Sequence, residues 1–318
     1  MSRSKPVVVV GSINTDLVAV STRIPAAGET VIGNDFQIHP GGKGANQAVA
    51  VARLGYPVRL IGCLGSDQFG AQLRSHLSGV GVDLAGVATV DGSSGVAVIV
   101  VSQDGENSIV VTPGANAHVT PQSLDANIEM IRQAGMVLAQ LEIPMETVEY
   151  LARICAREGV PLMLDPAPAM LLPTGVMKHI AWFTPNETEA AFFIEGQGQR
   201  NAQSAPVKST PAEVAETLLR EGARGVVLKR GAQGVYLATE DGLGELIPAL
   251  RVKAVDTTAA GDAFNGGFAT GLMLGKTPLE SARFATVVAA ISVTRHGAQP
   301  SLPTMDEVNE FKKSHAEA

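Results

Sequence analysis

The sequence predicts an α/β protein, in which a mostly parallel central sheet lies between two layers of helices and carries a small antiparallel sheet as a lid. Three observations lead to this fold class. Short apolar runs alternate with longer amphipathic stretches along most of the chain. Two segments lack the helical period and are typical of paired short strands. The 318 residues are 45% hydrophobic, enough for one large core, so we expect a single domain over residues 1–318.

The first expected strand, VVVV at 7–10, is typical of a strand that is buried on both faces. From there the pattern alternates, and helical stretches end at glycines such as Gly55. The remaining strands are expected at 58–65, 135–142, 161–165, 179–186 and 224–231. The helices are expected at 43–55, 67–81, 145–159, 187–195, 211–223 and 263–274. In such a sheet the ligand crevice lies at the carboxyl ends of the strands.

Residues 13–40 and 95–114 interrupt this alternation. Each contains strand-like runs joined by turn residues, and SQDGENS between VAVIVV and IVVTP is a hairpin signal. Because four short strands are not stable alone, we expect them to pack as a lid on the body, against a second subunit, or both. A homodimer formed through the lid sheet is therefore expected. Residues 196–210 are polar and glycine-rich and are expected to form a mobile surface insertion.

The composition excludes several classes of function. The net charge is −7 and the acids are dispersed, which argues against a nucleic-acid surface. No apolar run approaches the ~20 residues of a membrane span, so no membrane partner is expected. The two cysteines, Cys63 and Cys155, lie far apart, and MSRSKP has no apolar signal-peptide core, so a cytoplasmic location is expected. The six histidines show no metal-ligand spacing.

The sequence departs from two common nucleotide-binding motifs. In TGLMLGKT at 270–277, Thr270 stands where the first glycine of a P-loop is required, and no strand precedes it. In GSIN after the first strand, Ile13 occupies the place of the second glycine of a dinucleotide-binding loop. Neither a P-loop enzyme nor a dinucleotide-binding dehydrogenase is favoured.

The stretch DTTAAGDAFNGG at 256–267 enters a helix with almost no side-chain bulk. Such a start leaves unpaired N–H groups and the positive end of the helix dipole accessible to a phosphate. The acid in its first turn, Asp262, suits a base that takes a proton from a hydroxyl attacking that phosphate. It equally suits a helix carboxylate that stabilises the dipole. This stretch alone leaves both interpretations open.

Two further clusters follow expected strands or enter expected helices. In PGGKGANQAVAVARLG at 40–55, Lys43 and Asn46 lie on one helix face. In GSINTD at 11–16, Asn14 and Asp16 share one face of an extended segment. Amide, ammonium and carboxylate groups that face one way suit hydrogen bonding to a polyhydroxylated ligand.

GSINTD, GGKGANQA, DTTAAGDAFNGG and GAQPS together resemble the phosphofructokinase-B-like sugar kinases, and within them the ribokinase branch. The resemblance runs from Val7 to about Pro303. It implies ATP-dependent phosphorylation of the 5-hydroxyl of D-ribose under a closing lid, with ATP, Mg²⁺ and an activating monovalent cation, K⁺. The alternatives are a related kinase acting on 2-deoxyribose, a nucleoside or another small carbohydrate, and a ribose-binding sensor without catalysis.

Carried over residue by residue, the resemblance implies Asp262 as the base. The anion hole would be formed by Ala259, Ala260 and Gly261. The positions that match sugar-contacting residues are Asn14, Asp16, Gly42, Lys43, Gly44, Asn46, Glu142 and Asp262. The positions that match the nucleotide and magnesium site are Asn186, Glu189, Lys229, Gly231, Ala232, Gln233, Gly234, Gly261 and Thr286. The positions that match the K⁺ site, partly through backbone carbonyls, are Asp256, Thr258, Ser292, Arg295, Gly297 and Ser301.

The chain departs from the family pattern at three positions. Ala263 replaces a threonine after the expected base, Thr286 replaces an asparagine near the adenine, and Asp165 replaces a frequent asparagine. The change at Thr286 leaves the preference for ATP over other triphosphates open.

Some positions also have a simpler interpretation from the residues alone. Glu142 is typical of a solvated turn, and Asn186 of a helix cap. Lys229 and Arg230 are typical of solvated surface charges.

Overall fold

The computed structural model describes residues 4–194 and 209–316. Its central sheet contains nine strands in the order β13-β12-β11-β10-β9-β8-β1-β4-β5, and β13 and β12 are antiparallel to their neighbours. These strands are β1 (Val7–Val10), β4 (Val58–Gly65), β5 (Asp83–Val90), β8 (Met136–Ala139), β9 (Leu162–Leu164), β10 (Trp182–Phe183), β11 (Gly225–Lys229), β12 (Val235–Thr239) and β13 (Gly244–Ile247). The mostly parallel sheet is therefore confirmed, with an antiparallel edge.

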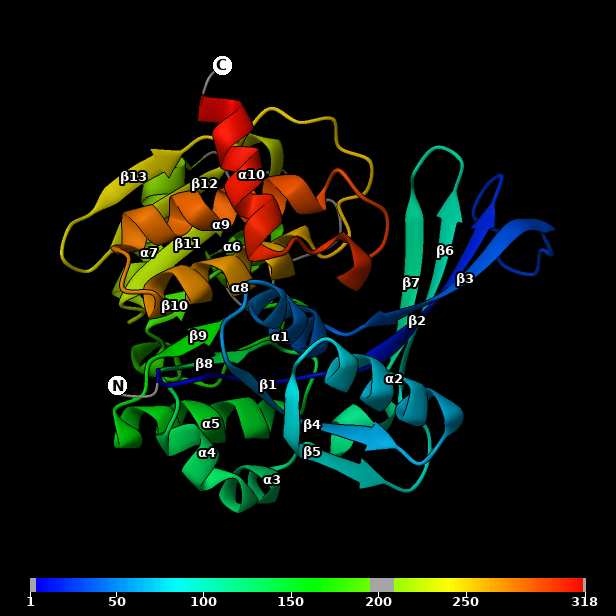
Figure 1. Ribbon diagram of the computed structural model, residues 1–318, viewed down its shortest axis with the longest axis horizontal. Coiled ribbons are helices and arrows are strands. Elements are labelled where there is room, and N and C mark those ends of the chain that lie inside the picture. The colour runs from blue at the N-terminus through cyan, green and yellow to red at the C-terminus, as the bar shows by residue number, and fades with distance from the viewer. Residues whose placement is uncertain (1–3, 195–208, 317–318) are drawn as a thin grey trace.

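Helices cover both faces of this sheet (Figure 1). One layer contains α1 (Lys43–Arg53), α2 (Gln68–Gly79), α8 (Ala260–Met273), α9 (Pro278–Ser292) and α10 (Met305–Ala316). The other contains α3 (Pro121–Ala126), α4 (Ile128–Arg132), α5 (Met145–Glu158), α6 (Glu187–Ile194) and α7 (Pro211–Arg220). Short 3₁₀ turns are η1 (Gly114–His118), η2 (Met177–His179), η3 (Gly231–Gln233) and η4 (Gln299–Ser301).

The VVVV strand shows why the layers form. Val7 and Val9 pack into the hydrophobic cluster under one helix layer, and Val8 and Val10 into the cluster under the other. All four side chains are fully buried, as the unbroken apolar run predicts.

The lid is a second sheet that projects from the body beside α1 and α2 (Figure 1). It consists of β2 (Asn14–Ser21), β3 (Gly33–Gly41), β6 (Gly95–Ser102) and β7 (Asn107–Thr112), in the order β3-β2-β6-β7. Its outer pairs are antiparallel, as predicted, and its central pair, β2 with β6, is parallel. The parallel pair follows from the body, because β2 and β6 continue from the same ends of two parallel strands, β1 and β5.

Several element boundaries differ from the sequence prediction. Helix α8 begins at Ala260 rather than 263, and the strand expected at 179–186 is reduced to Trp182–Phe183. The predicted mobile insertion at 196–210 lies, except for its last two residues, outside the described residues. Among the helices that the structure describes, none combines the length and apolar character needed to span a bilayer.

Candidate active site

A cavity of about 680 Å³ opens at the carboxyl edge of the central sheet. One end of it is polar, with Lys43, Asp165, Glu189, Lys229 and Asp262 in its wall. The other end is mainly apolar, and its lining residues include Leu250, Val252, Ala254, Thr286, Ala289, Ala290 and Val293. Asp165 and Lys229 stand at strand ends, and the other three polar residues stand in the first turns of α1, α6 and α8, at the edge where a sheet of this type binds its ligands.

The start of α8 forms one wall of the polar end. Ala259 precedes the helix with φ of 58°, a left-handed conformation that few residues other than glycine adopt. The backbone N–H groups of Gly261 and Asp262 donate no hydrogen bond to any residue that the structure describes. A Cβ placed on Gly261 would lie 3.3 Å from Lys229 Nζ, so the lysine ammonium lies beside these free donors. This is the geometry of an anion site.

The Asp262 carboxylate is buried at the edge of this anion site, with 4% of the residue exposed. Asn46 Nδ2 donates to its Oδ2 and Gln47 Nε2 to its Oδ1, each at 3.0 Å. Burial raises the pKa of Asp262 to about 6, against the opposing effect of Lys43. A carboxylate with such a pKa is ionised at neutral pH and is a stronger base than an exposed one.

The residues expected to bind the sugar converge beside Asp262. Asn14 and Asp16 begin β2, the strand that leads into the lid. The pKa of Asp16 is raised to about 7 by burial, then by the charges of Glu142 and Asp262, and Lys43 opposes the shift. Asp16, Glu142, Asp262 and Lys43 therefore interact as one cluster.

Lys43 is the cation of this cluster. Burial alone would lower the pKa of its ammonium group, but four carboxylates raise it above the ordinary value, and Asp262 contributes most. The other three are Asp165, Glu142 and Glu189. Lys43 is thus held charged among these four carboxylates, next to the residues that were expected to bind the sugar.

Two glycines allow α1 to start this close to the strands. Gly42 has φ of 87°, and a Cβ there would lie 2.6 Å from the backbone N of Asn14. A Cβ on Gly44 would lie 2.7 Å from the backbone of Gly11. The GGKG sequence is therefore required by close backbone approach at the end of β1.

The nucleotide side is built from the ends of β9, β10 and β11. Lys229 Nζ pairs with Asp165 Oδ1 at 2.9 Å. Asn186 and Glu189 bond each other reciprocally: Asn186 N and Nδ2 donate to the Glu189 carboxylate, and Glu189 N donates to Asn186 Oδ1. Asn186 is thus a helix cap, as its sequence context predicts. Burial raises the pKa of Glu189, and the charge of Lys229 opposes this shift.

The η3 loop borders the same cavity. Gly231, Ala232 and Gly234 line it, whereas Gln233 does not, and the Gln233 side chain accepts a hydrogen bond from Arg230. Thr286 lies at the apolar end, where its hydroxyl donates to Ala282 O.

The residues expected around K⁺ come from two loops that are joined by Asp256. Its carboxylate accepts hydrogen bonds from the backbone N–H groups of Thr258 and Gly297, each at 2.8 Å. Val255 and Asp256 also donate to Val293 O, which places Ser292 nearby. The Arg295 side chain pairs instead with Glu307, and Ser301 Oγ donates to Ala298 O.

In the described residues no cluster of three or more His, Cys, Asp or Glu side chains could hold a metal ion.

Two of the simpler interpretations are wrong. Glu142 is not a solvated turn residue, because its Oε2 accepts from Ser12 Oγ at 2.6 Å and from Lys43 N at 3.1 Å. The Lys229 side chain is only 13% exposed and is ion-paired, so it is not a solvated charge.

Four polar residues of the site were missed in the sequence. Asn116 Nδ2 donates to Asn14 Oδ1 at 2.7 Å, and Ser12 bonds Glu142. Gln47 contacts Asp262, and Gln140 contacts Gln47. A signal existed for Gln140, a polar residue directly after the apolar strand MVLA.

The chain is similar to known carbohydrate kinases over nearly its whole length. The model of the pfkB family carbohydrate kinases matches residues 4–305. The ribokinase of Haemophilus influenzae is 41% identical over 308 residues, which is 96% of this chain and 98% of that protein. The ribokinase of Bacillus subtilis is 40% identical over 303 residues, 95% of this chain and 98% of that protein. The structure of Arabidopsis thaliana ribokinase complexed with ribose and ATP superposes with a TM-score of 0.87 at 34% identity, covering 98% of this chain and 99% of that one. The chain therefore belongs to the pfkB family of carbohydrate kinases.

Proposed function

We propose that the protein transfers the γ-phosphoryl group of ATP to the 5-hydroxyl of D-ribose. The observation that carries this proposal is the placement of the buried Asp262 carboxylate beside the unpaired N–H groups that begin α8. A base and an anion site so close together suit the attack of an alcohol on a phosphoryl group. Ribokinases that are about 40% identical over nearly the whole chain support ribose as the acceptor.

In this mechanism Asp262 accepts the proton of the attacking hydroxyl. The N–H groups of Gly261 and Asp262, together with the Lys229 ammonium, stabilise the negative charge on the transferred group. Lys43, Asn14 and Asp16 hold the sugar hydroxyls, because they surround the base from α1 and β2. The apolar end of the cavity accommodates the nucleotide base.

The metal ions that the family implies fit residues of this site. Glu189 and Asn186 offer the hard oxygen donors that Mg²⁺ takes together with phosphate oxygens, and bound Mg²⁺ would neutralise phosphate charge. The loops joined by Asp256 fit a K⁺ site, since Thr258, Ser292, Arg295, Gly297 and Ser301 all lie on or next to them. Asp256 itself holds the loop that leads into α8.

The lid excludes water from the reaction. Because β2 supplies both Asn14 and Asp16 and then becomes a central lid strand, sugar binding and lid position are coupled. Closure would prevent the transfer of phosphate to water, the competing nucleophile.

The test is an ADP-release assay with ribose, 2-deoxyribose, nucleosides and other small sugars, with and without K⁺. Asp262→Asn should lower kcat by ~10²-fold or more while the protein stays folded and binds ATP. Release of ADP only with a sugar other than ribose would move the proposal to a related kinase. Ribose binding without any ADP release would identify a sensor.

A homodimer formed through the outer face of the lid is also proposed. The strand register places Ile38, Leu17, Val98 and Val110 in one row across all four lid strands. Ile38, Val98 and Val110 are 52%, 45% and 64% exposed, as is Phe36 in the next row at 58%. An apolar face of this kind is typical of an interface between subunits.

We further propose a cytoplasmic location, which the buried free thiols of Cys63 and Cys155 support.

A further inference from the structure

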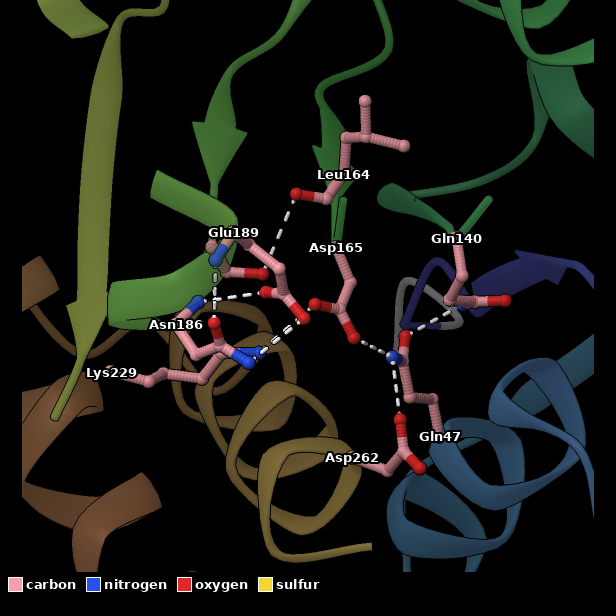
Figure 2. Close-up of polar contacts among 9 residues, drawn as sticks. Gln47, Gln140, Leu164, Asp165, Asn186, Glu189, Lys229 and Asp262 are labelled. Carbon is pink, nitrogen blue, oxygen red and sulfur yellow. Dashed lines mark hydrogen bonds and ion pairs between the residues drawn. The ribbon is translucent and has the colours of Figure 1, made fainter. Parts of the chain in front are cut away.

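The side-chain amide of Gln47 lies between two buried carboxylates. Its Nε2 donates to Asp262 Oδ1 and to Asp165 Oδ2, both at 3.0 Å. Gln47, Asp165 and Asp262 are 1%, 2% and 4% exposed. Figure 2 shows the amide nitrogen of Gln47 facing both carboxylates, while Gln140 approaches from the other side. Asp165, which departs from the family pattern, thus shares one donor with the proposed base.

Two neighbouring buried carboxylates tend to share a proton, because each charge raises the pKa of the other group. A base that held this proton could not accept one from the sugar hydroxyl. Hydrogen-bond donors to both carboxylates stabilise their charged forms and so oppose the sharing of a proton. Asp165 pairs through its second oxygen with Lys229, and Asp262 accepts from Asn46 through its second oxygen. Gln47 supplies the remaining donor to each.

The Gln47 amide can donate to both carboxylates in only one of its two orientations. If it turned over, its oxygen would face two negative charges and repel both. Gln140 prevents this rotation, because its Nε2 donates to Gln47 Oε1 at 2.7 Å. Gln140 therefore adds to the carboxylates a second restraint that keeps the N–H end of Gln47 toward them.

Stability alone does not favour a glutamine at position 140. The side chain is fully buried, and its Oε1 has no hydrogen-bond partner among the residues that the structure describes. An unpaired buried oxygen is destabilising, and an apolar side chain of similar size would remove it. The N–H group that Gln140 donates to Gln47 is therefore the reason for a glutamine at this position.

We propose that Gln140 is a positioning residue for phosphoryl transfer, which acts by fixing the amide of Gln47 between the carboxylates of Asp262 and Asp165. The inference rests on the proposed function of Asp262 as the base. The charged groups that face Asp262 are Lys43 from α1, Asp16 from β2 and Asp165 after β9.

The first experiment measures the pH profile of kcat for Gln140→Leu with ribose and ATP. We expect the acidic midpoint of kcat to rise by about one pH unit, from about 6, because Asp262 loses an oriented donor. This shift should lower kcat about tenfold at pH 5 and only about twofold at pH 7. The KM for ribose should stay within about twofold, since Gln140 donates its hydrogen bond to Gln47, which is not among the residues expected to bind the sugar. Gln140→Met has a side chain of similar length but no N–H to donate, and it should show the same loss of kcat.

Thr147→Val is the matched control. Thr147 is also fully buried, and its hydroxyl donates one hydrogen bond to Val119 O that valine cannot make. It lies on α5, in the helix layer opposite α8. We expect wild-type kcat and an unmoved pH profile in this variant. An equal loss of kcat in Thr147→Val, or a normal kcat and profile in both Gln140 variants, would overturn the inference.

A second experiment separates this inference from the proposed function. The ¹³C resonances of the aspartate carboxyls are titrated in the full chain without substrate, and Asp262 is assigned with Asp262→Asn. Gln140→Leu should raise the titration midpoint of Asp262, and the rise should shrink when Asp165→Asn is added, because the competing charge is gone. Equal rises in both backgrounds would contradict the inference. Failure of the wild type to phosphorylate ribose would sink the proposed function and leave this result standing.

Discussion

Single residues at the start of α8 determine how closely a phosphate could approach the proposed anion site. Gly261→Ala should leave the fold intact, because Gly261 has helical backbone angles and alanine is the better helix former, by up to ~1 kcal/mol. The added methyl would lie 3.3 Å from Lys229 Nζ, in the space between this ammonium group and the start of α8. We expect an equal or higher Tm together with a loss of at least ~10-fold in kcat. A variant with wild-type kcat would show that phosphate does not bind there.

The two raised carboxyl pKa values predict the acidic limb of the activity. Asp262 titrates at about 6 and Asp16 at about 7, so both are protonated at pH 5 and ionised at pH 8. We expect kcat/KM for ribose to rise across this range with a midpoint between those values. A profile that stayed flat from pH 5 to pH 8 would exclude an ionised Asp262 as the base.

Stability should show the opposite pH dependence at Asp16. Its pKa in the folded protein, about 7, lies above the ordinary value of 3.8, so the folded state binds the proton more tightly than the unfolded state. The stability contribution of this group is fully present below pH 3.8 and is lost as the pH rises through 7. Asp16→Asn should therefore raise Tm at pH 8, and hardly change it at pH 4, while it weakens ribose binding. Thermal melts at both pH values would check this.

The residues of the candidate site were largely predictable from the sequence. Asn14, Asp16, Lys43 and Asp262 follow glycine-rich turns, and the structure brings them together. Their supporting residues were not, because Asn116 and Gln140 act across more than ninety residues of chain on partners that only the fold reveals. The sequence pattern also cannot show that Lys229 is buried, because a lysine that ends an apolar strand is usually exposed to solvent.

At the scale of elements, α1 depends on glycine to reach the end of β1. Gly44→Ala would place a methyl 2.7 Å from the Gly11 backbone, so α1 must shift and carry Lys43, Asn46 and Gln47 with it. We expect a loss of about 1–3 kcal/mol in the free energy of unfolding, and a loss of activity at temperatures where the variant is folded.

Gly79→Ala in α2 is the matched control for this substitution. A methyl there meets no atom within 4 Å, so we expect stability to be unchanged or slightly improved. Chemical denaturation of both variants measures the difference. Equal stabilities would show that the GGKG turn tolerates side chains.

Elements with a clear period were predicted well, and the others were missed for physical reasons. Strand β4 matches its expected bounds, and α5 ends one residue before the expected Gly159. β12 and β13 were not predicted, because an antiparallel hairpin at the sheet edge breaks the alternation of strand and helix. The parallel contact between β2 and β6 depends on where both strands leave the body, which local sequence does not encode.

For the whole molecule, the outer face of the lid predicts association. Ile38→Asp would place a charge at the β3 end of the apolar row and should convert the proposed dimer into monomers in sedimentation experiments. The control is Leu246→Asp on β13, which is 54% exposed but lies on the body, and it should leave the mass unchanged. Identical masses of the Ile38→Asp variant and the wild type would place any dimer contact elsewhere.

One continuous strand, β2, begins among the sugar-binding groups and ends at the far tip of the projecting sheet. A strand that is paired on both sides is stiff, so rotation of the sheet about its base must also turn the two residues that begin it. In the proposed lid dimer, sugar release and the relative orientation of the two subunits would then depend on the same movement of the lid. A small molecule wedged between two such sheets would inhibit the enzyme at a distance, without ever competing with either substrate.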